Sequence, residues 1–141
     1  MKASLLLCDN AEVHNGRLYS MGGGLTWIWA NYPTPISVAA LFDLELAELG
    51  QEIPISVRVT AADGSPVFGS DSDGNSFEYA FSDRILTPNN GSSHDAELDY
   101  LWAGRWPGIH LPAGDYRVVM TNDATGEIVG RQSFTAYASN N

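Results

Sequence analysis

The chain has 141 residues and a formal net charge of −10, with 44% hydrophobic and 17% charged residues. This length suits a single domain spanning residues 1–141, and the hydrophobic content excludes a disordered chain. An acidic chain repels phosphate backbones and anionic lipids, so we expect neither nucleic acid nor membrane as a partner. The same charge is consistent with solubility or with docking on a basic surface.

The first residues raise the question of export. The sole cysteine, Cys8, excludes a disulfide within the chain, and the leucines before it predict a buried structural thiol. The apolar run of residues 3–7 is shorter than the apolar core of an export signal, so we expect no secretion by a signal peptide. No stretch reaches the roughly 18 apolar residues of a membrane span.

The first third of the chain alternates between short extended segments and turns. Residues 3–14 predict a first strand, Asn15-Gly16 a tight turn, and residues 18–21 a second strand. Three glycines at 22–24 predict a bulge or a close approach of another backbone. They do not form a phosphate loop, because no Lys-Ser/Thr follows. Extended structure resumes at residues 26–29.

The central segments carry the clearest strand signal. Residues 53–60 alternate strictly between apolar and other side chains, which indicates a strand with one buried face. Residues 36–46 are more apolar, and their alternation and flanking prolines favour a strand over a helix. Asp63-Gly64 is a strong hairpin signal.

The remaining segments complete the expected architecture. Alternation predicts strands at residues 77–81 and 116–120, and residues 128–137 close the domain, whereas residues 98–102 are mixed and residues 104–108 are irregular. Turn signals at this spacing predict an all-β, immunoglobulin-like β-sandwich of about eight or nine antiparallel strands.

Two segments resemble a known family. They read LLLCDNAEVHNGRLYSMGGG at residues 5–24 and LPAGDYRVVMTNDATGE at residues 111–127. The chain resembles an uncharacterised family of small β-sandwich proteins from actinobacteria and their bacteriophages. The resemblance includes the Asp63-Gly64 hairpin, whereas residues 69–106 depart from it. Because the family has no assigned activity, the resemblance implies no catalytic residue.

Tyr116 belongs to a Pro-x-Gly-x-Tyr sequence that is common in immunoglobulin-like domains. In such domains a tyrosine near the start of a strand can bond back to the backbone at a corner. Tyr116 either forms this corner or is a simple core tyrosine.

Catalytic chemistry has little support in the sequence. The histidines His14, His94 and His110 are scattered, and no segment places a nucleophile beside a base. The Gly-x-Ser-x-Gly elbow is also missing. We therefore expect no enzyme and no cofactor. His94, Asp95 and Glu97 form a weak candidate site for a transition metal.

One acidic loop resembles the start of a calcium loop. Asp71, Asp73 and Asn75 alternate in it, and hard cations prefer such oxygen ligands. The EF-hand pattern fails further on, because Gly74 comes too early and Ser82 stands where glutamate is needed. A polar turn with at most weak cation binding is expected.

Aromatic and arginine side chains are the candidate contact residues, since such residues are enriched among interface hot spots. The expected anchors lie in a segment predicted to be exposed: Tyr100, Trp102, Arg105 and Trp106. Trp27 and Trp29 share one face if their segment is a strand. They form either part of the core or a contact platform for a protein or a sugar.

These observations favour a non-enzymatic bacteriophage virion protein, either a capsid decoration protein or a tail component. Such a protein acts by burying surface against other virion proteins, as a homo-oligomer or bound to a lattice. A carbohydrate- or ligand-binding β-sandwich module is the alternative. We expect localisation in the virion after synthesis in the host cytoplasm.

Overall fold

The fold is nearly all β, with 66% of residues in strands and 2% in helix. The structure is a computed structural model, and it describes residues 1–88 and 99–139. The strand content confirms the predicted all-β sandwich class. The short 3-10 helix η1 (Leu46–Glu48) follows β5. The strands are β1 (Lys2–Cys8), β2 (Asn10–His14), β3 (Arg17–Met21), β4 (Trp27–Trp29), β5 (Thr34–Asp43), β6 (Glu52–Ala61), β7 (Phe68–Ser70), β8 (Ser76–Glu78), β9 (Ala80–Leu86), β10 (Asp99–Ile109), β11 (Gly114–Asn122) and β12 (Glu127–Tyr137).

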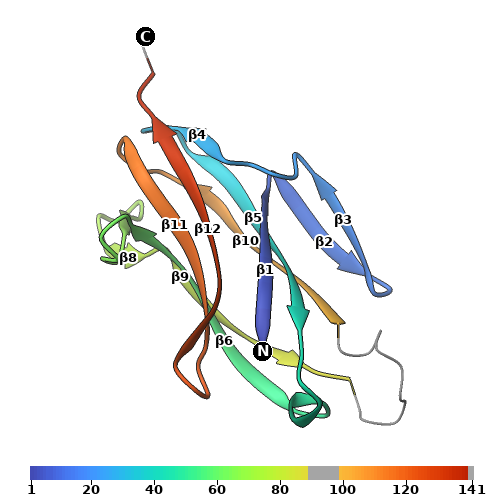
Figure 1. Cartoon of the computed structure of the whole chain (residues 1–141). Coiled ribbons are helices and arrows are strands. Elements are labelled where there is room, and N and C mark those ends of the chain that lie inside the picture. The colour runs from blue at the N-terminus through green and yellow to red at the C-terminus, as the bar shows by residue number, and fades with distance from the viewer. Residues whose placement is uncertain (89–98, 140–141) are drawn as a thin grey trace.

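Two sheets form the layers of the sandwich (Figure 1). One has three strands in the order β1-β5-β10, and the other has five in the order β4-β12-β11-β6-β9. Pairing is antiparallel except between β4 and β12, which are parallel. The hairpin β2–β3 lies against β10 and β5 of the smaller sheet, and β7–β8 forms a second hairpin.

The core lies between the two sheets and follows from the alternation in the sequence. On β6, the side chains of Ile53, Ile55, Val57 and Val59 all point inward and are buried. They join one cluster with inward residues of β5, β10, β11 and β12. Full burial of such a side chain contributes about 1.5–3 kcal/mol, so these positions fix which face of each strand is inward.

Strand β10 differs from the sequence expectation. Residues 99–109 form one strand instead of a mixed and then irregular segment, although its pairing with β5 shifts register between Trp106 and Ile109, within the stretch expected to be irregular. Trp102 and Trp106 are only 7% and 6% exposed, so the prediction that they are surface anchors is wrong. The ring of Phe81 on β9 stacks on Trp102 at 5.9 Å between centroids and meets Trp106 edge-on at 5.0 Å. A side chain at Gly104 would collide with Trp102 and Phe81, so glycine makes room for the rings.

Two predicted strands are broken into shorter ones, and β7 forms at the start of the expected polar loop, so the described residues contain twelve strands instead of eight or nine. The expected strand at residues 3–14 ends at Cys8, and the chain bends at Asp9 so that β2 pairs with β3. The expected strand at residues 77–81 is interrupted at Tyr79, which is buried. The Tyr79 hydroxyl accepts a hydrogen bond from the His110 N–H at 3.0 Å.

The corner that was one of the two interpretations of Tyr116 is present. The Tyr116 hydroxyl donates to the carbonyl oxygen of Pro112 at 2.7 Å, and its ring stacks on Phe134 inside the core. Tyr116 is therefore both a corner tyrosine and a core tyrosine.

Replacement of Trp102 or Trp106 by alanine should destabilise the fold. Truncation of a buried tryptophan costs about 3–5 kcal/mol, because it removes buried apolar area and leaves a cavity. Urea unfolding followed by far-UV circular dichroism would measure the loss in the free energy of unfolding. The control Arg105→Ala, at an exposed position of the same strand, should change it by less than about 0.5 kcal/mol. A W102A variant as stable as the wild type would contradict the buried position.

Candidate functional site

Strand β4 presents two tryptophans on one face. Ile28, at its centre, is 3% exposed and points into the core, so its neighbours Trp27 and Trp29 point the opposite way. Each of the two is 48% exposed. Of the two interpretations left open by the sequence, core or contact platform, the structure supports the exposed one.

The two indoles form an angled pair. Their ring centroids lie 5.1 Å apart and their planes meet at 79°. The exposed ring of Tyr137 on β12 lies 6.3 Å from Trp27 at 61°. Edge-to-face contacts of this kind are favourable, so each ring limits the freedom of its neighbour. The result is a partly ordered apolar surface at the end of the sheet.

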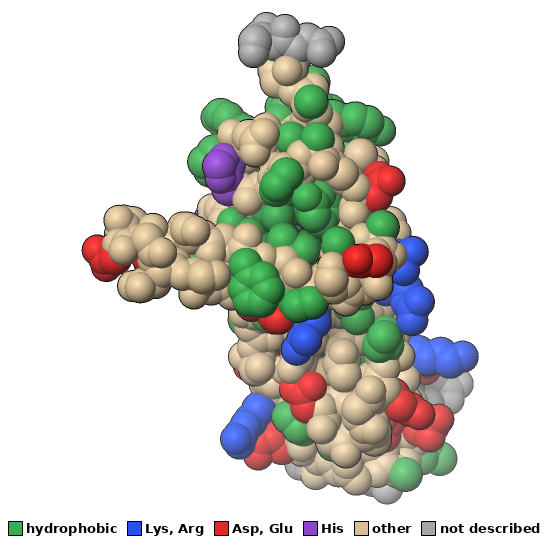
Figure 2. Space-filling model, turned by 90° about the vertical axis from the view of Figure 1, so that its left-hand side faces the viewer, with side chains coloured by type: hydrophobic (Ala, Val, Ile, Leu, Met, Phe, Trp, Pro, Cys, Tyr) green, Lys and Arg blue, Asp and Glu red, His purple; other side chains and the backbone are tan. Residues whose placement is uncertain are grey.

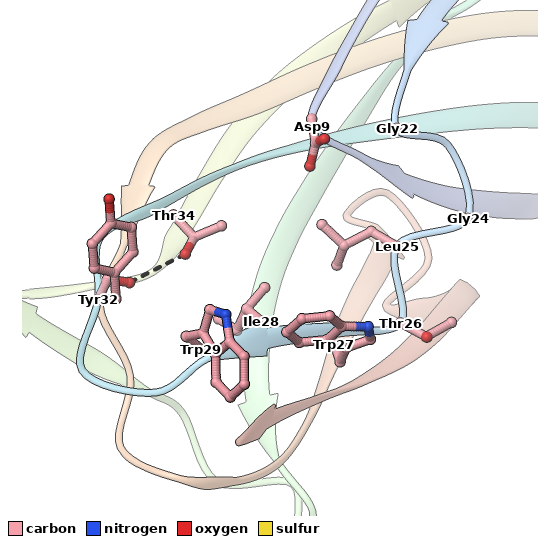
Figure 3. Close-up of a pocket in the computed structure, with 10 residues that line it drawn as sticks. All are labelled: Asp9, Gly22, Gly24, Leu25, Thr26, Trp27, Ile28, Trp29, Tyr32 and Thr34. Atoms are coloured by element: carbon pink, nitrogen blue, oxygen red, sulfur yellow. Dashed lines mark hydrogen bonds between the residues drawn. The ribbon is translucent and has the colours of Figure 1, made fainter. Parts of the chain in front are cut away.

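A pocket of about 410 Å³ lies beside the indoles, within the range of small-ligand sites. In Figure 3 the Trp27 and Trp29 rings lie side by side along β4, with Asp9 and Leu25 on the other side of the space and Tyr32 at one end. We call this the tryptophan pocket. Its lining residues are Asp9, Gly22, Gly24, Leu25, Thr26, Trp27, Ile28, Trp29, Tyr32 and Thr34.

The backbone around the three glycines holds Asp9 at this pocket. The Asp9 N–H donates to the Met21 carbonyl at 3.0 Å, and the N–H groups of Gly24 and Leu25 both donate to the Leu7 carbonyl. Gly22 has a φ of +64°, and a side chain there would collide with the Asp9 carboxylate. The backbone of Leu7 approaches this segment at Gly24, as the three glycines predicted, whereas Gly22 is approached by a side chain, which is why glycine is required there.

The neighbouring thiol is poorly suited to catalysis. Cys8 is fully buried. Burial, and secondarily the negative charge of Asp9, raises the pKa of the Cys8 thiol above its ordinary value. Because the thiolate is the nucleophile, burial and the raised pKa both disfavour attack by Cys8 at neutral pH.

The acidic loop folds as a polar turn between β7 and β8. One carboxylate oxygen of Asp71 accepts hydrogen bonds from the N–H groups of Asp73 at 2.9 Å and Asn75 at 2.8 Å. Across residues 1–88 and 99–139, no group of three or more His, Cys, Asp or Glu side chains is placed to hold a metal ion. The other metal candidates, His94, Asp95 and Glu97, lie outside the described residues.

The structure separates the aromatic residues that the sequence grouped as candidates. Tyr100 is half-buried against the core, 6.3 Å from the ring of Phe42, and Arg105 is exposed on β10. Tyr32, Tyr137 and Asp9 were missed as site residues. The interruption of an apolar run by Asp9 could have signalled a strand end, whereas no local signal predicts that β12 lies beside β4.

Neither the comparison with protein-family models nor the search of curated proteins returns a match to this chain. Within the described part of the chain, no helix is long and apolar enough to cross a membrane.

Thiol labelling tests the environment of Cys8. The native protein at neutral pH should react with a thiol reagent at least about a hundredfold more slowly than the urea-unfolded protein, because opening of the fold must precede attack. The reaction is followed by absorbance or mass spectrometry. Labelling of the native protein at the unfolded rate would show that Cys8 is accessible.

Proposed function

We propose that the protein is a non-enzymatic binding protein that contacts its partner through Trp27 and Trp29. The resemblance to proteins of actinobacteria and their phages supports a virion protein as the partner, which makes the chain a capsid decoration or tail component. The observation that carries the proposal is the pair of half-exposed indoles on β4. Tryptophan is among the residues most enriched at interface hot spots.

The indoles are prepared for binding. Each ring retains about half of its surface for burial against a partner, and its contacts with the other ring and Tyr137 reduce the entropy lost on docking. Exposed large apolar groups gathered in one place typically mark an interaction site. The tryptophan pocket therefore combines exposed area with partial preorganisation.

The backbone of β4 favours a protein partner. Thr26 accepts a hydrogen bond from Thr135, and Ala30 donates to Tyr137, so the even-numbered residues face β12. By alternation, the backbone groups of Trp27 and Trp29 face the open edge, because β4 is the end strand of its sheet. An extended segment of another protein can add to such an edge while its side chains contact the indoles.

A carbohydrate ligand is the second candidate. The Asp9 carboxylate and the Thr34 hydroxyl line the tryptophan pocket, and such groups can bond sugar hydroxyls while an indole stacks on the sugar ring. The Thr34 hydroxyl donates to the Tyr32 carbonyl at 3.2 Å, which leaves its oxygen free to accept a hydrogen bond. Both candidates use the same two tryptophans.

The double variant W27A/W29A should lose partner binding and stay folded, since both side chains are half-exposed. We expect co-sedimentation with purified virions from a producing culture to fall at least about tenfold, the loss of one hot-spot contact. A matched control replaces two exposed aromatics elsewhere, Tyr19 and Phe68, by alanine and should bind normally.

Three results would decide against the virion proposal. One is absence of the wild-type protein from purified virions by mass spectrometry. Another is undiminished co-sedimentation of W27A/W29A. The third is quenching of wild-type tryptophan fluorescence by soluble glycans, lost in W27A/W29A, without virion binding; this would support the carbohydrate candidate instead.

A further inference from the structure

Three arginines gather on the outer face of the five-stranded sheet. Arg58 on β6 and Arg131 on β12 flank Val119 of the central strand β11, which pairs with both. Arg117 lies two residues before Val119, so its side chain is on the same face. All three arginines are exposed.

These side chains line a hollow of about 380 Å³, which we call the arginine hollow. The other lining residues are Thr60, Gly64, Val119, Thr121, Asp123 and Ile128. Among the described residues, none of the three arginines forms an ion pair. The hollow thus holds three of the seven Lys and Arg residues of a chain whose net charge is −10. Such a concentration of unpaired guanidinium groups is typical of a surface that recognises carboxylate or phosphate groups.

The hairpin β7–β8 carries the opposite charge. We call residues 68–78 the acidic arm: the segment has no Lys or Arg, and Asp71 and Asp73 occupy its turn. Figure 2 shows an arm projecting from the body with acidic side chains at its tip. Asp71 bonds the turn through one oxygen only, which leaves its other oxygen and the exposed Asp73 carboxylate available.

The acidic arm and the arginine hollow lie on different sides of the molecule. At the base of the arm, the Tyr79 hydroxyl bonds His110, which directly follows β10 of the three-stranded sheet. The hollow instead lies on the outward face of the five-stranded sheet. An arm directed away from that face cannot place its tip in the hollow of its own chain. A contact between the two must therefore join separate molecules.

We propose that the acidic arm of one copy docks in the arginine hollow of the next. The two carboxylates of the tip oppose three guanidinium groups and the single carboxylate of Asp123, so the net charges of the two surfaces match in size. The planar guanidinium groups can bind the carboxylates through paired hydrogen bonds. Because the two surfaces differ, the contact is head-to-tail and generates a ring or an open chain of copies.

The affinity of this contact should first rise and then fall as the salt concentration increases. The contact is small and should have a dissociation constant on the order of 100 µM. Near zero salt, long-range repulsion between two acidic bodies opposes it. At about 0.1 M salt the Debye length is about 10 Å, so the short ion pairs outweigh the repulsion, whereas at about 1 M salt they too are screened. Association should pass through a maximum between these limits.

The test uses two complementary variants of the full chain. The first, Arg117→Gln with Arg131→Gln, disables the hollow and keeps the arm. The second, Asp71→Asn with Asp73→Asn, disables the arm and keeps the hollow, and the amide oxygen introduced at position 71 would still cap the turn. Sedimentation velocity at about 0.1 M salt measures each variant alone and the two mixed. Lys2→Gln with Arg17→Gln is the control, since it removes two exposed positive charges elsewhere.

The wild type and the control should self-associate, and each variant alone should do so at least about tenfold more weakly. The mixture should form heterodimers and nothing larger, because only one intact arm and one intact hollow can meet. Far-UV circular dichroism should show both variants folded. A wild type that stays monomeric up to about 1 mM would overturn the proposal. The proposal would also be wrong if the two variants do not associate when mixed. Binding of inorganic phosphate to the wild type and not to the first variant would not rescue it, because that result would show an anion site without the contact between copies.

This contact is independent of the proposed function. The variant W27A/W29A should self-associate like the wild type, because neither tryptophan lines the arginine hollow. Loss of self-association in W27A/W29A, with both charge variants unaffected, would assign self-association to the tryptophan pocket and overturn the arm-to-hollow contact.

Discussion

The burial of apolar side chains between the two sheets is the constraint on which the structure depends, and aromatic rings complete it at one edge of the sandwich. Strand β10 ends the three-stranded sheet and β9 ends the five-stranded sheet, so no backbone hydrogen bonds join these edges. Phe81 on β9 reaches both Trp102 and Trp106 on β10, and the Trp102 indole N–H donates to the Asp83 carboxylate at 2.9 Å. These contacts join the two layers at this edge, and Gly104 allows them by leaving space for the rings.

Two of the four tryptophans, Trp102 and Trp106, lie in the core, and the other two lie at the surface. On β4 the inward position is taken by Ile28, and β12 covers one side of the strand, so the indoles of Trp27 and Trp29 can only face outward. The bend at Asp9 and the positive φ of Gly22 bring the Asp9 carboxylate to the tryptophan pocket. The candidate site is thus built by one short strand and one glycine-dependent turn.

The sequence predicted the strands and turns that local patterns determine. It did not predict the contacts between residues that lie far apart in the chain. Strict alternation at residues 53–60 identified β6, and Pro112 to Tyr116 gave the corner as one of two interpretations, because both signals lie within a few residues. The glycines at 104 and 108 made β10 look irregular, since nothing local shows that the rings of Phe81 and Trp102 fill the space above Gly104. For the same reason Trp102 and Trp106 were predicted to be exposed. The contact between the rings of Trp27 and Tyr137 could not be predicted either, because the two residues are 110 positions apart in the sequence.

Fluorine NMR of the protein labelled with 5-fluorotryptophan tests most directly the claim that Trp27 and Trp29 form the binding surface while Trp102 and Trp106 belong to the core. The chain has four tryptophans, so four resonances are expected, and W27F and W29F assign two of them. Those two should show a solvent isotope shift between H₂O and D₂O and should broaden on addition of purified virions, while the other two do neither. Solvent isotope shifts confined to Trp102 and Trp106, or broadening of those two alone, would contradict the account.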